Sequence, residues 1–370
     1  MNKKVNSMML VLLVTAMILS ACGSAADASS STSVSSVSSQ INGAGSTFAL
    51  PVYSDWIYTY QSVNPSVTLN YQGIGSGGGK KGIIDNTLDF AGSDAVLTAD
   101  EYTAGKDLQM YPTLAGAVVP IYNIEGVSQA LVLKGAILAG IYDATITKWN
   151  DPAIAALNPS VNLPDAIITA VHRSDGSGTT EIFTNALAAF SADWKANVGA
   201  STSVEWPVDK AGNGIGGKGN QGVAAAVQNT PNSIGYVELS FAIANNITFA
   251  DMINKAGNKV TADADSLASA MSDFAGSFTD QLTNTIVDGP GANSWPIAGY
   301  TYLILHTSSM TDCAKAKNML DFFKWALTDP TPAKHAADLG YSVLPDAVRT
   351  QVLAKMGEVT CNGSTVLSNP

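Results

Sequence analysis

Short runs rich in β-branched and aromatic residues alternate along this chain with stretches of helical apolar period. The β-rich runs are VTLNYQ (67–72), LDFAGS (88–93), AVVPIYNI (117–124), IITAVHR (167–173), SIGYVEL (233–239) and YTYLILH (300–306). Residues 49–62 and 178–190 carry aromatic and aliphatic side chains at helical spacing. Strands separated by helices predict an α/β protein with mainly parallel sheets.

Length and charge narrow the possible functions. At 370 residues the chain is longer than one hydrophobic core usually carries, so we expect two domains. A formal net charge of −11 argues against nucleic acid as a partner. If the ligand is an anion, the overall field repels it, so binding must depend on local dipoles and a few placed charges.

The first residues have the pattern of an export signal. Lys3 and Lys4 precede an apolar run at 8–19, which is too short to cross a bilayer, where roughly 20 residues are needed. The sequence LSAC then ends at Cys22 and resembles the lipobox of bacterial lipoproteins. We therefore expect residues 1–21 to be removed and Cys22 to carry the lipid that anchors the chain outside the cytoplasm.

Residues 22–40 are rich in serine and contain no aromatic residue or periodic apolar pattern. Such a segment buries too little surface to offset the entropy of ordering it. The composition predicts a tether, and we expect the folded body to begin near Ile41.

The remaining cysteines and the histidines bear on disulfides and metals. Cys313 and Cys361 form an even pair in an oxidising compartment, so a disulfide between them is possible. In the chain-entropy model it would be worth about 4 kcal/mol. The histidines at 172, 306 and 335 show no ligand spacing, which argues against a zinc site.

Three segments share one design, in which small and hydroxyl residues lie between a strand and a helix. They are NGAGSTFALP (42–51), YQGIGSGGGKKGII (71–84) and HRSDGSGTTEIF (172–183). The first amide groups of a helix have no partner within it and carry about half a positive charge. Glycine lets the backbone approach closely, and hydroxyls add donors, so the design predicts an anion site.

A dinucleotide-binding motif is a second interpretation of the segment at 71–84. Gly73, Gly75 and Gly78 match GxGxxG, and Asp94 follows at the distance of a dinucleotide fingerprint. Export argues against it, because nicotinamide cofactors are not expected outside the cytoplasm. The second match, at 212–217, follows no predicted strand and reads as a loop or the lead-in to a helix at Gln221.

His172, Asp175 and Ser177 have the residue types of a hydrolytic triad. Residues this close around one turn cannot easily point at one another in the required order, and Ser177 has no GxSxG elbow. We therefore expect no catalytic residue here and treat a secreted hydrolase as an alternative.

The ordered motifs of the chain resemble those of a known family, over residues 42 to about 350. They are GAGSTF, YQGIGSGGG, DFAGSDAVL, HRSDGSGTTEIF, GGKGNQGVAAAVQ, SIGYVEL, WPIAGYTYLIL, DFFKWAL and LGYSVLPDAV. This set resembles the substrate-binding protein of the bacterial high-affinity phosphate ABC transporter. The resemblance implies a two-lobed, type II periplasmic-binding-protein fold with phosphate in the cleft between the lobes.

The resemblance also implies a ligand set. The groups expected to donate to phosphate belong to Thr47, Phe48, Ser76, Arg173, Ser177, Gly178 and Thr179. Asp175 is implied to orient the guanidinium of Arg173. Ser46 and Gly77 stand where the family often has Ala and Ser, and from these small changes we expect altered affinity at most. Lys80 and Lys81 read as a solvated helix face.

Asp94 would face the anion, and like charges in a desolvated site repel. Phosphate resolves this conflict, because both of its common forms carry a hydroxyl that can donate to a carboxylate, whereas sulfate has none. A site built around a ligand donor can reject the analogue lacking it by roughly 10⁴–10⁵-fold. Taken alone, Asp94 after Gly92 and Ser93 would more often be an ordinary turn residue, and the other segments favour the ligand role.

By the family pattern, residues 41–123 and 300–370 form one lobe and residues 124–299 the other. The implied partners are inorganic phosphate, the membrane permease and ATPase subunits of an ABC transporter, and the membrane through the lipid; no cofactor, metal or nucleic acid is expected. Alternatives are a carrier of another oxyanion such as sulfate, molybdate or a phosphonate, a secreted phosphate-ester hydrolase, and a structural or adhesive surface lipoprotein.

Overall fold

The computed structural model describes residues 39–367. Its strands are β1 (Ser39–Gly45), β2 (Val67–Gly73), β3 (Phe90–Ser93), β4 (Leu108–Asn123), β5 (Val132–Lys134), β6 (Thr169–Arg173), β7 (Gly214–Gly217), β8 (Ser233–Glu238), β9 (Asp251–Ile253), β10 (Lys259–Val260), β11 (Ala298–His306), β12 (Ser342–Val343), β13 (Thr360–Cys361) and β14 (Ser364–Thr365). Its helices are α1 (Leu50–Val63), α2 (Ser76–Ile84), α3 (Ala99–Gly105), α4 (Gly135–Tyr142), α5 (Pro152–Leu157), α6 (Gly178–Phe190), α7 (Ala192–Asn197), α8 (Pro207–Lys210), α9 (Gly219–Asn229), α10 (Leu239–Ala244), α11 (Ala264–Asp273), α12 (Cys313–Thr328), α13 (Pro330–Asp338) and α14 (Asp346–Met356). The six predicted strands and both predicted helices are present.

The main sheet has the strand order β2-β1-β3-β11-β4-β8-β6-β7, and β12 adds to β4. Its outer strands are parallel, as predicted: β1 pairs in this way with β2 and β3, and β6 with β7 and β8. The prediction of mainly parallel pairing was wrong for the centre, because β11 is antiparallel to both of its neighbours and β4 is antiparallel to β8. The result is a mixed α/β sheet.

The strand β4 belongs to both halves of this sheet. Residues 108–117 pair with β11, and residues 118–123 pair with β8. Every residue of β4 except Asn123 at its end is buried. One continuous strand therefore joins the part of the sheet that holds β1 to β3 with the part that holds β6 to β8.

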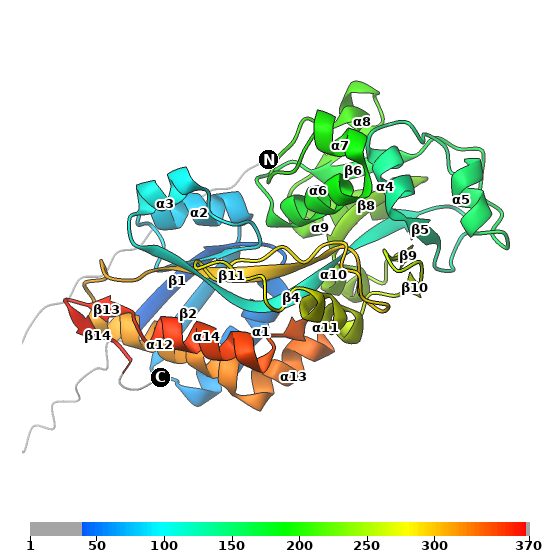
Figure 1. Cartoon of the computed structure of the whole chain (residues 1–370). Coiled ribbons are helices and arrows are strands. Elements are labelled where there is room, and N and C mark those ends of the chain that lie inside the picture. Colours follow the sequence, from blue (N-terminus) through cyan, green and yellow to red (C-terminus); the bar gives the residue numbers. More distant parts are fainter. Residues whose placement is uncertain (1–38, 368–370) are drawn as a thin grey trace, which may run out of the picture. The chain divides into compact units, whose positions relative to one another are not determined.

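Helices cover both faces of the β1–β3 part. In Figure 1, α2 and α3 lie on one side of these strands, and α1, α12, α13 and α14 lie on the other. In the other part, α9 packs on β6, β7 and β8. Trp56 and Tyr60 of α1 and Phe183 and Leu187 of α6 are buried, so the apolar side chains at helical spacing in residues 49–62 and 178–190 belong to the core.

Some local expectations need correction. β1 already begins at Ser39, inside the range predicted as tether. The glycine run at 214–217, predicted as a loop or helix lead-in, forms strand β7, because its backbone pairs in parallel with β6. The helix expected from Gln221 begins at Gly219.

The Cys313–Cys361 disulfide is confirmed: the two Cα atoms lie 5.5 Å apart, and the bond joins the start of α12 to β13. Among the described helices, none combines the length and the apolar character that crossing a membrane requires. The predicted export signal and lipid anchor at Cys22 lie outside the described residues.

Candidate functional site

Three helices begin at the turns that the sequence singled out. α1 begins at Leu50 after β1, α2 at Ser76 after β2, and α6 at Gly178 after β6. The unpaired amides at the start of a helix favour negative charge nearby. Four hydroxyl side chains of these turns are buried, those of Thr47, Ser76, Ser177 and Thr179.

The turns of α2 and α6 meet directly. The Gly77 N–H donates to the Gly176 carbonyl oxygen at 3.0 Å. A methyl group placed at Gly178 would lie 2.5 Å from the Ser76 Oγ and 2.6 Å from the Asp94 Oδ2. Only glycine therefore permits α6 to begin this close to Ser76 and Asp94.

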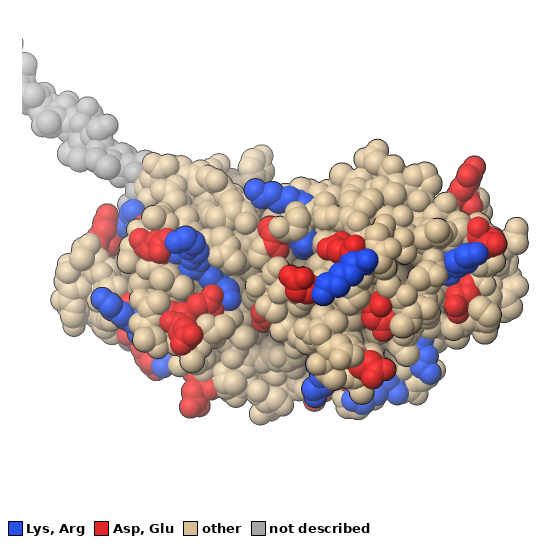
Figure 2. All heavy atoms as spheres, turned by 90° about the horizontal axis from the view of Figure 1, so that it is seen from above, with Lys and Arg blue, Asp and Glu red and all other residues tan. Residues whose placement is uncertain are grey.

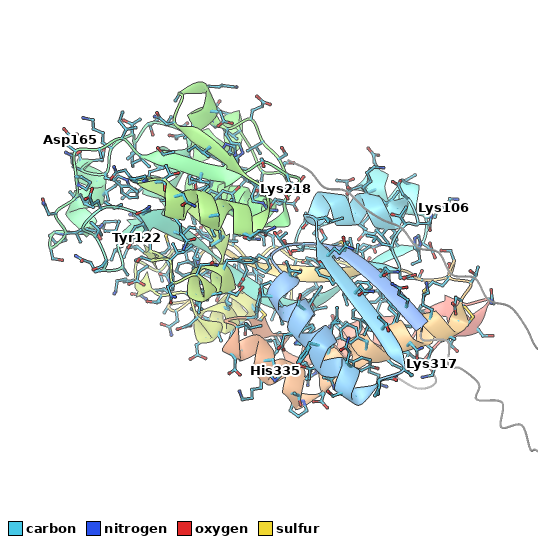
Figure 3. All side chains as sticks on the ribbon, turned by 180° about the vertical axis from the view of Figure 1, so that it is seen from behind. Lys106, Tyr122, Asp165, Lys218, Lys317 and His335 are labelled. Atoms are coloured by element: carbon cyan, nitrogen blue, oxygen red, sulfur yellow. A yellow bond between two sulfur atoms is a disulfide. The ribbon has the colours of Figure 1, made fainter. Side chains whose placement is uncertain are left out.

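The turn before α1 is joined to α6 by Asn220. Asn220 is the second residue of α9, which follows Lys218 (Figure 3). Its amide Nδ2 donates to the Thr47 Oγ1 at 2.9 Å and to the Thr179 Oγ1 at 3.1 Å, and its backbone N–H also donates to Thr47 at 3.1 Å. With both lone pairs occupied, the Thr47 hydroxyl keeps its proton for another acceptor.

Arg173 is the buried cation of this site. Its Nε and Nη2 donate to the two carboxylate oxygens of Asp175 at 2.8 and 2.6 Å, and its Nη1 lies 3.3 Å from the Thr179 Oγ1. Burial raises the pKa of Asp175, but the hydrogen bonds and charge of Arg173 outweigh it, so this pKa lies below its ordinary value. The fork geometry fixes the plane of the guanidinium.

Asp94 is the buried carboxylate of the same site. Its Oδ1 accepts from the Ser46 Oγ at 2.5 Å and from the Thr301 Oγ1 at 2.8 Å, while its Oδ2 has the Ser76 Oγ at 3.3 Å. Burial raises the pKa of Asp94 to about 6, against the opposing hydrogen bonds and the charge of Arg173. Asp94 and Arg173 thus interact electrostatically across one buried region.

The remaining predicted residues frame this region. The Ser177 Oγ accepts from the Thr180 N–H at 3.0 Å, so it caps α6 and keeps its own proton to donate. The ring of Phe48 is fully buried against Tyr341, and the Phe48 carbonyl oxygen accepts from the Tyr341 hydroxyl at 2.6 Å. All of the predicted ligand residues therefore come from these turns and from the end of β3.

Four residues at the site were missed as site residues by reasoning from the sequence. They are Ser46, Thr301, Asn220 and Glu238. Asn220 follows a Gly-Lys-Gly turn at a helix start, which is a signal for a fourth turn of the same design. Thr301 lies inside the apolar strand YTYLILH and gave no signal.

Glu238 is fully buried next to Asn220. Its N–H donates to the Asn220 Oδ1 at 2.9 Å, and its Oε2 lies 2.9 Å from the Tyr341 hydroxyl. The single Tyr341 proton is already directed to Phe48, and the Glu238 Oε1 has no partner. Burial raises the pKa of Glu238 to about 8, so at neutral pH this carboxyl adds no negative charge to the site.

The two competing interpretations meet specific obstacles in the geometry. The His172 Nε2 pairs with Asp209 at 2.9 Å and its Nδ1 contacts the Arg173 carbonyl oxygen, while Asp175 binds Arg173. His172 and Asp175 are therefore bonded to other residues and do not form a catalytic triad with Ser177. At Gly75, whose φ is +86°, a methyl group would lie 2.5 Å from the Asp175 Oδ2, so this glycine serves close approach to a carboxylate.

The interpretation of Lys80 as a solvated residue was wrong. Its side chain is buried and donates to the Glu101 carboxylate at 2.9 Å and to the Val96 carbonyl oxygen at 3.2 Å. Lys81 does face solvent, where it pairs with Asp85. The reason is that α2 packs against α3, which brings Glu101 over the Lys80 face.

The face of the molecule in Figure 2 has no surface charge pattern that would attract an anion. Figure 2 shows acidic and basic side chains interspersed over one face of the described chain, without a broad basic region on that face. The net charge of −11 likewise provides no long-range attraction for an anion.

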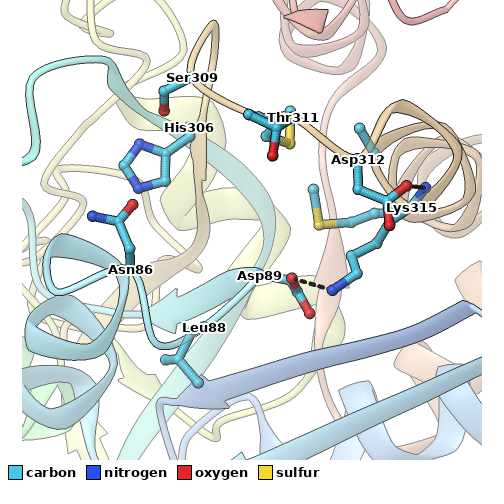
Figure 4. Close-up of a pocket in the computed structure, with 11 residues that line it drawn as sticks. Asn86, Leu88, Asp89, His306, Ser309, Thr311, Asp312 and Lys315 are labelled. Atoms are coloured by element: carbon cyan, nitrogen blue, oxygen red, sulfur yellow. Dashed lines mark hydrogen bonds and ion pairs between the residues drawn. The ribbon is translucent and has the colours of Figure 1, made fainter.

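The cavity drawn in Figure 4 lies apart from these turns. It has a volume of about 220 Å³, and it is lined in part by Asn86, His306 and Ser309 and by the ion pair of Lys315 with Asp89 at 3.0 Å. His306 is engaged with Asp107, outside this lining, and the Asp312 carboxylate accepts from the Lys315 backbone N–H at 3.0 Å. Within residues 39–367 no cluster of histidine, cysteine or acidic side chains could hold a metal ion.

Comparison with known proteins gives a consistent result. The model of the PBP superfamily domain matches residues 30–330. The chain is 42% identical to the phosphate-binding protein PstS of Xylella fastidiosa, strain Temecula1, over 85% of this chain and 84% of that protein. It is 40% identical to the phosphate-binding protein PstS of Pasteurella multocida, over 85% of this chain and 89% of the relative.

A solved structure supports the fold. The subatomic-resolution structure of a high-affinity periplasmic phosphate-binding protein (PfluDING) with bound phosphate matches with a TM-score of 0.67. The match covers 85% of this chain and 93% of the other, at 22% identity. At that identity the likeness establishes a common two-lobed fold.

Proposed function

Because this chain belongs to the PstS phosphate-binding protein family, we propose that it binds inorganic phosphate outside the cytoplasmic membrane and delivers it to the permease and ATPase subunits of a phosphate ABC transporter. The observation that carries the proposal is the buried grouping of Arg173, Asp94 and several hydroxyls. It combines one fixed cation, many donors and one acceptor carboxylate, which is what a protonated tetrahedral oxyanion requires.

In this proposal the phosphate oxygens accept hydrogen bonds from both sides of the site. The donors are the hydroxyls, backbone amides and guanidinium of Thr47, Phe48, Ser76, Arg173, Ser177, Gly178 and Thr179. Asp175 fixes the orientation of the Arg173 guanidinium plane, because both carboxylate oxygens of Asp175 accept hydrogen bonds from Arg173. The helix starts add partial positive charge at the same point.

Asp94 supplies the selectivity. Above pH 6 it is ionised and accepts the phosphate hydroxyl, whereas sulfate would present only acceptors to a carboxylate. The unpaired contact would cost sulfate roughly 10⁴–10⁵-fold in affinity.

We assign residues 41–123 and 300–370 to one lobe and residues 124–299 to the other. Contacts between the two ranges support a closed arrangement, such as that of Thr47 with Asn220 and that of Gly77 with Gly176. Since each lobe holds only part of the donor set, phosphate stabilises the closed form, and the permease can recognise that form.

Calorimetric titration of the purified chain tests this function. We expect phosphate to bind and sulfate to be rejected at a pH well above 6, with sulfate binding strengthening as the pH falls below 6 and Asp94 takes up a proton. Equal affinity for the two anions above pH 6 would refute the selectivity, and no heat with either would refute the function.

The chain is proposed to bind without catalysing a reaction. His172 is engaged with Asp209 rather than with Ser177, whose hydroxyl caps α6, so the pairing of nucleophile and base is lacking in this geometry. Turnover of an aryl phosphate that disappears in Ser177→Ala would contradict this view.

We also propose that Cys22 carries a lipid that holds the protein at the membrane. In bacterial cells the unchanged chain is then expected in the membrane fraction, and the Cys22→Ser chain in the soluble extracytoplasmic fraction. The same distribution for both chains would exclude this anchor.

A further inference from the structure

Two buried hydroxyls act on the same oxygen of Asp94. The Ser46 Oγ and the Thr301 Oγ1 lie 2.5 and 2.8 Å from its Oδ1, and both residues are 0% exposed. They come from separate elements, since Ser46 follows β1 and Thr301 lies in β11. The hydroxyl pair is therefore assembled only in the folded chain.

The proton of Ser46 has a defined direction. The Ser46 Oγ accepts from the Ala49 N–H at 3.2 Å, which leaves its own proton for Asp94. Its backbone is fixed as well: the Ser46 N–H donates to Gly92 at 2.8 Å, and the Tyr71 hydroxyl donates to the Ser46 carbonyl oxygen at 2.9 Å. Ser46 thus serves Asp94 and has no proton left for a ligand.

Thr301 is held in the same way. Its carbonyl oxygen accepts from the Thr113 Oγ1 at 3.2 Å, and Thr113 in turn contacts the Tyr53 hydroxyl at 2.9 Å. A carboxylate oxygen has two lone pairs, so the two hydroxyls fill Oδ1. Oδ2, with the Ser76 Oγ at 3.3 Å, is the oxygen left for a ligand hydroxyl.

We propose that Ser46 and Thr301 are specificity-determining positioning residues, which hold Asp94 as an anion with Oδ2 toward the ligand and so extend the rejection of sulfate to more acidic pH. This inference rests on the proposed phosphate function. Its physical basis is that a protonated Asp94 would itself be a donor, and sulfate, which has only acceptors, could then bind.

Other charged groups near Asp94 act in different ways. The titratable groups that interact with it are Arg173 from β6, Glu181 from α6, Glu238 from β8, Tyr53 from α1, Tyr71 from β2 and Tyr341 before β12. The pKa values of the tyrosines lie above 10, and that of Glu238 is raised to about 8, so these groups are neutral at acidic pH. Of the effects that lower the pKa of Asp94, those of Ser46 and Thr301 are the largest.

The test measures phosphate and sulfate affinities by calorimetry across acidic and neutral pH for the full chain, Ser46→Ala, Thr301→Val and the double variant. In the unchanged chain, discrimination should fall with a midpoint near pH 6. Each single variant should move this midpoint up by about one pH unit, because one hydrogen bond to a charged group is lost. The sulfate affinity at pH 7 should then rise about fivefold, in proportion to the protonated fraction of Asp94.

Variants that keep the hydroxyl, and a variant that does not contact Asp94, separate the proposed effect on Asp94 from a general loss of packing. Ser46→Thr and Thr301→Ser retain a hydroxyl and should restore the midpoint. Thr113→Val removes a buried hydroxyl from the same network without a contact to Asp94 and should leave the midpoint near 6.

The outcomes distinguish this inference from the proposed function. If the double variant binds phosphate with an unchanged midpoint, the inference is wrong while the function stands. If the unchanged chain binds no phosphate, the function itself fails. If Ser46→Ala does not fold, Thr301→Val tests the inference, because valine has nearly the same shape as threonine.

Discussion

Asp94→Asn is expected to remove most of the discrimination between phosphate and sulfate, which we place at roughly 10⁴–10⁵-fold. The amide has the shape of the carboxylate, but it carries a donor as well as an acceptor. A sulfate oxygen would then meet an N–H group instead of a second acceptor. Calorimetric affinities for both anions above pH 6, where Asp94 is ionised, measure the ratio.

Asp89→Asn is the matched control for this change. Asp89 is also a hydrogen-bonded carboxylate, but its partner is Lys315 and it lines the separate cavity of Figure 4, so the ratio should be unaffected. A phosphate-to-sulfate ratio that stays the same in Asp94→Asn, with phosphate still bound, would remove the account of selectivity.

Arg173→Ala should weaken phosphate binding by about 30- to 5,000-fold. Truncating one partner of a buried, hydrogen-bonded charge pair costs about 2–5 kcal/mol. Two effects contribute here: the ligand loses its one charged donor, and the partly buried Asp175 is left without its cation. The dissociation constant for phosphate at neutral pH measures the sum of the two.

A double-mutant cycle separates these effects. If the unpaired carboxylate of Asp175 causes part of the loss, Arg173→Ala combined with Asp175→Asn should bind better than Arg173→Ala alone. Arg173→Lys keeps the charge but loses the fork to Asp175, so it should fall between the unchanged chain and Arg173→Ala. Near-normal affinity in Arg173→Ala would show that Arg173 lies outside the binding site.

The turns of the site could be predicted because their signals are local. Glycine and hydroxyl residues before a helix specify a backbone that exposes its first amides, whatever the rest of the chain does. For this reason the starts of α1, α2 and α6 follow the sequence closely. Which of these starts meet was supplied by the family resemblance rather than by the local pattern.

The features that could not be predicted depend on contacts between residues that are distant in the sequence. Thr301 contacts Asp94 across 207 positions, and within its strand it has the pattern of an ordinary core residue. Lys80 is buried because Glu101 of α3 folds over it. Strand β7 consists largely of glycine, and its identity comes from pairing with β6 rather than from propensity.

Strand direction was also beyond the local pattern. A buried strand shows a continuous apolar run in either orientation, so β4 and β11 gave no sign that they run against their neighbours.

The continuity of β4 has a consequence for how this chain tolerates insertions. Side chains alternate along a strand, so one residue added between Ala117 and Val118 would turn the whole segment 118–123 over while leaving 108–117 in place. The donors contributed from the two sides of the molecule would no longer face each other. Their alignment is thus set by a residue count along one backbone, and this link should be among the least permissive places in the protein for a change of length.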